Sequence, residues 1–186
     1  MRSSSSLLIA ITLLLLLASV LPPSTQSKND DDDDSGYLID RICKKTPFFD
    51  LCSATLHANP LTPKSDLKTI ALVVVKDILV NATETLSHIE SLIHHTSDRR
   101  LEHSLAFCAE CYIPLIKYTL PQAADAVSQG QFGFAAYCVR YTAKQVHRCE
   151  RKLGGTKASS PLEDQNGVVH KLAGVASAII KLLLNA

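Results

Sequence analysis

The sequence predicts an all-α protein, an up-down-up-down four-helix bundle with an N-terminal helical hairpin stapled by a disulfide. From Tyr37 onward, apolar residues recur at spacings of three and four, the period of amphipathic helices. No segment alternates apolar and polar residues as a strand would, and no internal repeat is present. Four long periodic segments follow one another through short turns, which favours antiparallel neighbours in a bundle.

The N-terminal 36 residues are predicted to lie outside the folded domain. Residues 1–27 have one basic residue, Arg2, then an apolar run and a Pro-containing zone of small residues, the pattern of a secretory signal peptide. Residues 28–36 form an acidic flexible tail with five consecutive aspartates. The folded domain is expected at 37–186, with the hairpin at 37–60 and the bundle at 65–186. No later segment is predicted to span a membrane, so the exported chain is expected to be extracellular.

The hairpin is predicted from a short apolar segment around Ile39 and a turn at Thr46–Pro47, where Thr46 can cap the next helix. Cys43 and Cys52 are close enough in sequence to join its two arms. A ring of this size stabilises the fold by about 2.5–3 kcal/mol, from the entropy that it removes from the unfolded chain.

The first long helix is expected to begin after Ser65 or Asp66, either of which can cap it, and to end near His94–Thr96. At about 30 residues it would measure about 45 Å. Ser97 is the predicted cap of the following helix. The apolar stripe of the first helix comprises Leu67, Ile70, Val74, Ile78, Ala82, Leu86, Ile89 and Ile93.

The remaining three helices are predicted from similar stripes. The next helix contains Pro114 and Pro121, and each should bend it because proline lacks the backbone N–H. A turn at 127–131 precedes a helix with Phe134, Cys138, Tyr141, Gln145 and Cys149 on one side. Ser160–Glu163 is interpreted as a capping box that opens the last helix, whose stripe is Leu162, Val169, Ala173, Ala176, Ile180 and Leu183.

The six cysteines all follow the signal peptide, so in an oxidising compartment they are expected to form disulfides. If the two helices on either side of Gly130 are antiparallel, Cys149 lies opposite positions 108 to 111. It can then pair with Cys108 or Cys111, and the stripe position of Cys108 favours the former. A ring of about 40 residues stabilises the fold by about 4 kcal/mol. Cys138 lies about 10 Å from Cys111 along the helix, beyond the roughly 7 Å between Cα atoms that a disulfide allows.

Several functional classes are disfavoured. Without Arg2 the basic and acidic residues balance at 18 each, which argues against a nucleic-acid partner. Cys108, Cys111, His147 and Cys149 could supply four metal ligands, but zinc knuckles usually occupy tight loops, and secreted thiols oxidise. The histidines are scattered, and no nucleophile motif accompanies them. We therefore expect no enzyme activity, no metal and no cofactor.

At this point the sequence resembles the plant invertase and pectin methylesterase inhibitor family, over essentially the whole of 37–186. The resemblance rests on "ICKKTPFFDLC", "ALVVVKDI", "CAECY", "LPQAADAVSQGQF", "CERKL" and the C-terminal "SPLEDQNGVVHKLAGVASAIIKLLL". It implies a four-helix bundle with an N-terminal hairpin, and disulfides Cys43–Cys52 and Cys108–Cys149. Cys111 and Cys138 are then additional cysteines, which are either free buried thiols or paired through a distorted helix.

The resemblance also implies a function, that of a secreted protein that inhibits a cell-wall or vacuolar enzyme. The pattern is closest to the invertase inhibitors, in which a Pro-Lys-Phe motif just after a glycine contacts the active-site cleft of invertase. Here the corresponding triplet is Phe132–Gly133–Phe134, which keeps only the final Phe. Gln131, Phe132, Gly133 and Phe134 are therefore the candidate partner-binding residues. Packing in the bundle end is favoured for Phe134, whereas both interpretations remain open for Phe132.

Two alternatives and one modification site complete the predictions. A pectin methylesterase could be the target instead, bound in the same 1:1 manner and blocked sterically. A helical module that binds a small apolar ligand in its core is the third interpretation. Asn81-Ala82-Thr83 is a glycosylation sequon on the export route, in the apoplast or on the way to the vacuole.

Overall fold

The computed structural model describes residues 38–60, 62, 66–154 and 160–185, in which every regular element is helical. A short helix at 38–43 is followed by α3 (Phe49–Ala58), α4 (Leu67–His95), α5 (Arg99–Pro114), the π-helical turn η3 (Leu115–Thr119), α6 (Leu120–Ser128), α7 (Phe132–Leu153) and α8 (Glu163–Leu184). The all-α prediction is confirmed. The predicted signal peptide at 1–27 and acidic tail at 28–36 lie outside the described residues.

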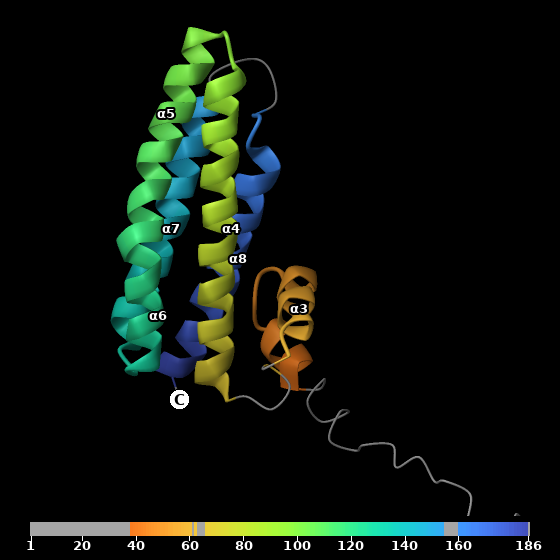
Figure 1. The fold of residues 1–186 in the computed structure, drawn as a ribbon. Coiled ribbons are helices and arrows are strands. Elements are labelled where there is room, and N and C mark those ends of the chain that lie inside the picture. Colours follow the sequence, from red (N-terminus) through yellow and green to blue (C-terminus); the bar gives the residue numbers. More distant parts are fainter. Residues whose placement is uncertain (1–37, 61, 63–65, 155–159, 186) are drawn as a thin grey trace, which may run out of the picture. The chain divides into compact units, whose positions relative to one another are not determined.

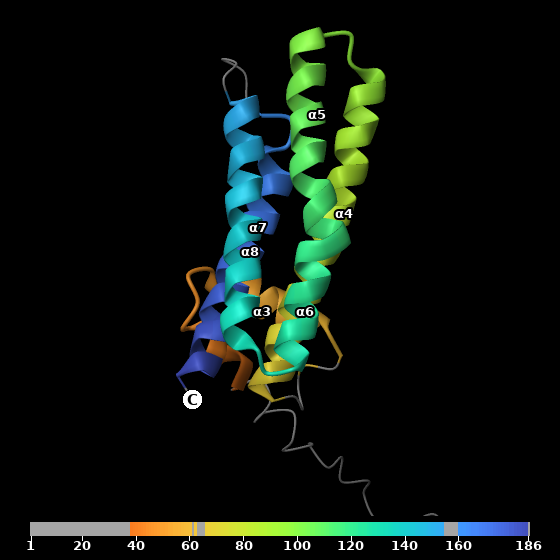
Figure 2. The ribbon, with the colours of Figure 1, turned by 90° about the vertical axis from the view of Figure 1, so that its left-hand side faces the viewer.

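Four helical rods form the bundle, with α5, η3 and α6 together making the second (Figure 1). Consecutive rods run in opposite directions (Figures 1 and 2). The first rod, α4, packs against α5 and α8, and α7 also packs against α5 and α8, so the four rods enclose one core. This arrangement leaves the turn between α6 and α7 at the end of the bundle where α4 begins (Figure 2).

The first rod follows its predicted stripe closely. Asp66 caps α4 because its carboxylate accepts a bond from the N–H of Thr69 at 2.7 Å, a bond that also lowers the pKa of Asp66. The predicted cap of the next helix, Ser97, is wrong. Asp98 caps α5 instead, since its Oδ1 accepts bonds from the N–H groups of Arg100 and Leu101. A carboxylate one residue later therefore reaches two free amides of the helix end.

The two prolines of the second rod lie on either side of a π-helical turn. Pro114 is the last residue of α5, and Pro121 is the second residue of α6, which follows the π-helical turn without a break. Between them, η3 has the wider π-helical winding. The predicted distortion of this helix is therefore taken up by one wide turn between two regular segments.

The last rod begins later than predicted, and Ser160–Glu163 is not a capping box. The Oγ of Ser160 accepts a bond from the N–H of Leu162 at 3.2 Å and donates to Glu150 on α7 at 3.1 Å, so it ties the preceding turn to α7. By length and composition α8 is apolar enough to cross a membrane. In the structure its inward face supplies seven buried apolar residues and Asn166 to the bundle, where α8 packs against α4 and α7.

The N-terminal hairpin packs against α4 and α8 and is stapled by Cys43–Cys52, whose Cα atoms are 5.5 Å apart. The predicted cap at Thr46 is wrong, because α3 starts only at Phe49 and the Thr46 hydroxyl donates to the carbonyl of Cys43 instead. The ring of Phe48 lies so close to α8 that a Cβ on Gly174 would come within 2.9 Å of it. A glycine at this position of α8 therefore allows the hairpin to approach.

Candidate functional site

The predicted partner-binding residues lie at the turn that joins α6 to α7. Gly130 has a φ of 75°, a left-handed conformation that favours glycine. Its N–H donates to the carbonyl of Val127 at 3.1 Å, and the N–H of Gln131 donates to that of Ala126 at 2.8 Å. These two bonds form a Schellman motif, which satisfies the last carbonyls of α6 and fixes the direction in which α7 leaves.

Of the two phenylalanines of the turn, Phe134 has the opposite placement from the one favoured by the sequence, and Phe132, for which both interpretations were open, lies inward. Phe132 is half-buried and packs against the core, whereas Phe134 is 46% exposed. The reason is the start of α7 at Phe132. Residues three, four and seven positions later, Ala135, Ala136 and Val139, share its inward face, whereas Phe134 is rotated by about 200° away from it. The preference for Phe134 as a core residue is therefore wrong.

Gln131 and Gly133 complete the predicted set, and both are exposed. Gln131 is the residue before the first turn of α7, and its side chain donates to that of Gln129 at 3.1 Å. No atom outside the immediate backbone lies within 4 Å of a Cβ built on Gly133. The tip of the hairpin is therefore open at three of its four predicted residues.

An aromatic ladder, defined here as Phe134, Tyr137 and Tyr141, continues from the tip along α7. The ring centroids are 6.4 Å apart at both steps, and the planes differ by only 13° and 20°. The exposed fractions are 56% for Tyr137 and 36% for Tyr141. The sequence predicted that Tyr141 shares a face with Cys138, Gln145 and Cys149. That prediction is wrong, because these three residues are buried and Tyr141 is not.

The stripe predicted for α7 includes Tyr141, so the sequence did not predict an exposed ladder of three aromatic residues. The signal that identifies it is the 134, 137, 141 spacing, which places the three rings along one helix face. Three adjacent exposed aromatics give a large apolar surface at low entropic cost, the composition that is typical of binding hot spots.

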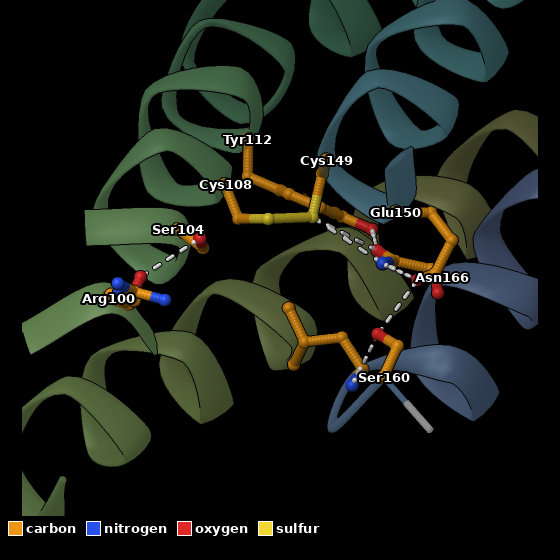
Figure 3. The surroundings of a disulfide bond; sticks show 9 residues. Arg100, Ser104, Cys108, Tyr112, Cys149, Glu150, Ser160 and Asn166 are labelled. Atoms are coloured by element: carbon orange, nitrogen blue, oxygen red, sulfur yellow. Dashed lines mark hydrogen bonds between the residues drawn. A yellow bond between two sulfur atoms is a disulfide. The ribbon is translucent and has the colours of Figure 1, made fainter. Parts of the chain in front are cut away.

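A disulfide and a buried polar network hold α7 in place behind this surface (Figure 3). Cys108 on α5 is bonded to Cys149 on α7, with Cα atoms 4.7 Å apart. Beside the sulfurs, the Tyr112 hydroxyl donates to Oδ1 of Asn166 at 2.7 Å, and Nδ2 of Asn166 donates to Glu150 at 2.6 Å. The bond and the network join α5, α7 and α8, so the base of the α6–α7 hairpin is fixed to the rest of the bundle.

The pairing of Cys108 rather than Cys111 follows from the helix faces. Cys108 is fully buried on the stripe with Leu105 and Tyr112, whereas Cys111 lies to one side, near Arg148. Cys111 and Cys138 are free and buried, and burial raises the pKa of both thiols. Unreactive thiols of this kind behave as small apolar side chains of the core.

The predicted glycosylation site lies in the middle of α4. Asn81 is half-buried, and its Nδ2, the atom that would carry the glycan, donates to the carbonyl of Asp77 at 2.9 Å. Thr83 also uses its hydroxyl inside the helix, as a donor to Leu79 at 2.8 Å. Modification of Asn81 would therefore have to precede the formation of α4.

The described residues contain no cluster of three or more His, Cys, Asp or Glu side chains that could hold a metal ion. A groove of about 310 Å³ opens between Phe48, α7 and α8. Its lining includes His147, Glu150, Glu163, His170 and Lys171, so it differs from the apolar core cavity that the small-ligand interpretation requires.

Comparison with known proteins agrees with this architecture. Residues 37–179 match the family described as plant invertase/pectin methylesterase inhibitor. The chain is 30% identical over 144 residues to the cell wall / vacuolar inhibitor of fructosidase 1 of Arabidopsis thaliana, an alignment that covers 77% of this chain and 68% of that protein. It is 21% identical over 145 residues to pectinesterase inhibitor 2 of the same species, covering 78% and 83%.

A solved structure shares the fold. A mutant form of a pectin methylesterase inhibitor from Arabidopsis superimposes with a TM-score of 0.67 at 20% identity, covering 76% of this chain and 93% of that one.

Proposed function

Because the chain belongs to the plant invertase/pectin methylesterase inhibitor family, we propose that it is a secreted inhibitor that blocks a plant acid invertase sterically. The tip residues Gln131–Phe134, with the adjacent ladder ring of Tyr137, would occupy the active-site cleft of the enzyme in a 1:1 complex. The single observation that carries this proposal is the exposed Phe134 beside the hairpin turn, at the start of an exposed ladder. The similarity to an inhibitor of fructosidase supports the choice of target.

Inhibition of this kind needs rigidity and no chemical step. A loop that is already ordered loses little conformational entropy when it docks, so more of the contact energy remains as affinity. The Schellman turn at Gly130 and the Cys108–Cys149 bond provide that order at the two ends of the hairpin. The rings of Phe134 and Tyr137 supply the contact area, and the occupied cleft then excludes substrate.

A pectin methylesterase is the second candidate target. The similarity to pectinesterase inhibitor 2 and the shared fold with a pectin methylesterase inhibitor favour it. The Pro and Lys of the invertase-binding motif are replaced here by Phe132 and Gly133, and this replacement also leaves room for the second target.

Secretion, domain limits and modification belong to the same proposal. Residues 1–27 would direct export and 28–36 would precede the folded domain at 37–186. The names of the relatives point to the cell wall or the vacuole as the place of action. Asn81 would carry a glycan only on those chains that are modified before α4 forms.

The test is a parallel inhibition assay against acid invertase and pectin methylesterase with the wild type and Phe134→Ala. We expect inhibition of invertase, weakened about 10- to 100-fold by the substitution, because a central aromatic anchor is typically worth about 2 kcal/mol or more. The melting temperature should stay unchanged, since the ring is half exposed.

The matched control is Val80→Ala, which removes an apolar side chain that is 53% exposed on α4. It should inhibit as the wild type does. Inhibition of pectin methylesterase alone would select the second target, and a Phe134→Ala variant as potent as the wild type would refute the proposed surface.

A further inference from the structure

The aromatic ladder is only the first half of a longer exposed stripe on α7. The side chains at positions 134, 137, 141, 144, 148 and 151 follow one another at spacings of three and four, which keeps them on one helix face. All of them are exposed. The second half of this face is cationic. We call it the basic stripe, and it comprises Lys144, Arg148 and Arg151 together with the neighbouring exposed Lys152.

The acidic residues near the basic stripe include Glu110 on α5, whose charge acts together with that of Arg148 on the thiol of Cys111. Glu150 is the one acidic residue of α7, and it faces Asn166 and Ser160 on the other side. No ion pair of Lys144 or Arg151 occurs within the part of the chain that the structure describes.

Phe107 of α5 lies beneath two cations of the stripe. The guanidinium of Arg148 is 5.4 Å from the centroid of its ring, and the Nζ of Lys152 is 5.8 Å from it. Contacts of this kind orient a cation over a ring without neutralising the charge of the cation. The stripe is thus partly pre-ordered for an anionic partner.

The shape of the stripe favours a partner with regularly repeated charges. Spacings of three and four residues correspond to steps of about 4.5–6 Å along the helix. None of these side chains lines the groove between Phe48, α7 and α8 or the two further grooves that lie beside α4. A single phosphate or carboxylate would need donors that converge on it, whereas a linear polyanion can follow a ridge of evenly spaced cations.

The neighbouring rings select among polyanions. Tyr141, the ladder residue farthest from the tip, continues the line of the cations and offers a partly exposed ring on which a sugar can stack. Nucleic acid is disfavoured because duplex DNA carries one charge per about 1.7 Å of its axis, which is far denser than cations spaced at about 4.5–6 Å along a helix. A membrane surface is disfavoured because the basic stripe has no apolar side chain to insert among its cations.

We propose that the basic stripe of α7 binds a linear polysaccharide whose repeating sugar carries a carboxylate. The setting rests on the proposed function, since relatives of this chain are named for the cell wall or the vacuole. Bound in this way, the inhibitor would be retained on an acidic polysaccharide matrix while the tip of the hairpin stayed free for the enzyme.

The test measures binding of the full exported chain to polygalacturonate, with neutral dextran as the comparison polymer. The wild type should bind polygalacturonate, and binding should weaken as salt is raised, because exposed charges are screened. In the double variant Lys144→Glu/Arg151→Glu, binding should weaken about tenfold or more, since two attractions become repulsions. The control Lys68→Glu/Lys76→Glu makes the same charge change on exposed positions of α4 and should bind as the wild type does.

Three results would overturn the proposal: equal binding of dextran, a double variant that binds as the wild type does, or duplex DNA or anionic vesicles bound as tightly as polygalacturonate. Inhibition assays without polysaccharide separate this idea from the proposed function. Lys144→Glu/Arg151→Glu should still inhibit the target, whereas loss of inhibition in every form with polygalacturonate binding intact would refute the proposed function alone.

Discussion

At the scale of single residues, Tyr112 connects helices of the bundle through a buried hydrogen-bonded network. Its side chain is fully buried, and its hydroxyl donates to Asn166 on α8, which in turn donates to Glu150 on α7. A buried polar group is expensive to leave unpaired, so each bond of this chain depends on the others. The network thus favours one relative placement of α5, α7 and α8.

Replacement of Tyr112 by Phe should lower the free energy of unfolding by about 1–2 kcal/mol, because Oδ1 of Asn166 loses its donor in a buried site. Chemical denaturation of the purified variant measures this change. Tyr118→Phe removes the same hydroxyl from a side chain that is 62% exposed, and its stability should match that of the wild type. Equal stability of the two variants would mean that the buried bond contributes nothing.

The candidate surface could be located from the sequence but not resolved residue by residue. The turn around Gly130 and the four tip residues were identified correctly as a hairpin end. The orientation of Phe132 and Phe134 depends on the first residue of α7, and a shift of one position rotates every side chain by about 100°. The direct signal for the exposed face is the run of aromatic and then basic residues at spacings of three and four.

At the scale of elements, the periodicity predicted each long helix, but several predicted capping residues were wrong. Ser97 and Ser160 were both expected to cap a helix, yet Asp98 caps α5, and Ser160 bonds to Glu150 instead. Several polar side chains near a helix end compete for the same free amides, and tertiary partners decide the outcome. The π-helical turn has a similar explanation, since two prolines predict a distortion but not its form.

Two glycines of α8 provide a matched test of how the N-terminal hairpin docks. A Cβ at Gly174 would lie 2.9 Å from the ring of Phe48, whereas nothing lies within 4 Å of a Cβ at Gly167. Gly167→Ala should raise the free energy of unfolding by about 0.5–1 kcal/mol, through helix propensity alone. The free energy of unfolding of Gly174→Ala should be about 1–3 kcal/mol lower than that of Gly167→Ala, because overpacking displaces Phe48.

Thermal or chemical denaturation of both variants checks this difference. Hydrogen exchange of residues 49–58 measures directly how often the N-terminal hairpin opens. Exchange there should accelerate only in Gly174→Ala. If the two alanine variants were equally stable and exchanged alike, the contact between Phe48 and α8 would not hold the hairpin.

At the scale of the whole molecule, the core accounts for the placement of all six cysteines. The sequence alone left Cys149 free to pair with Cys108 or Cys111, because both lie opposite it in an antiparallel hairpin. The choice depends on which side of α5 faces α7 in the packed bundle, and only the assembled core determines that. Cys111 and Cys138 then remain as thiols inside the same core.

One buried tyrosine and two buried cysteines, which can lose a proton at high pH, make the stability of the fold sensitive to alkaline pH. Burial raises the pKa of Tyr112, and it also raises those of Cys111 and Cys138. A raised folded-state pKa means that the unfolded chain releases its protons first as pH increases. The stabilising contribution of these groups is therefore complete below about pH 8, near the foot of the thiol titration, and declines through the ordinary values of about 8.5 for Cys and 10 for Tyr.

We expect the free energy of unfolding to fall between about pH 8 and pH 10.5, with a slope that approaches about 1.4 kcal/mol per pH unit for each group that ionises only on unfolding. Urea titrations at a series of pH values measure the slope. Tyr112→Phe should flatten it at the upper end, where the phenol titrates, and Cys111→Ala/Cys138→Ala should flatten it nearer pH 8.5. A slope that is the same in the wild type and in both variants would mean that the three groups ionise as readily in the folded bundle as in water.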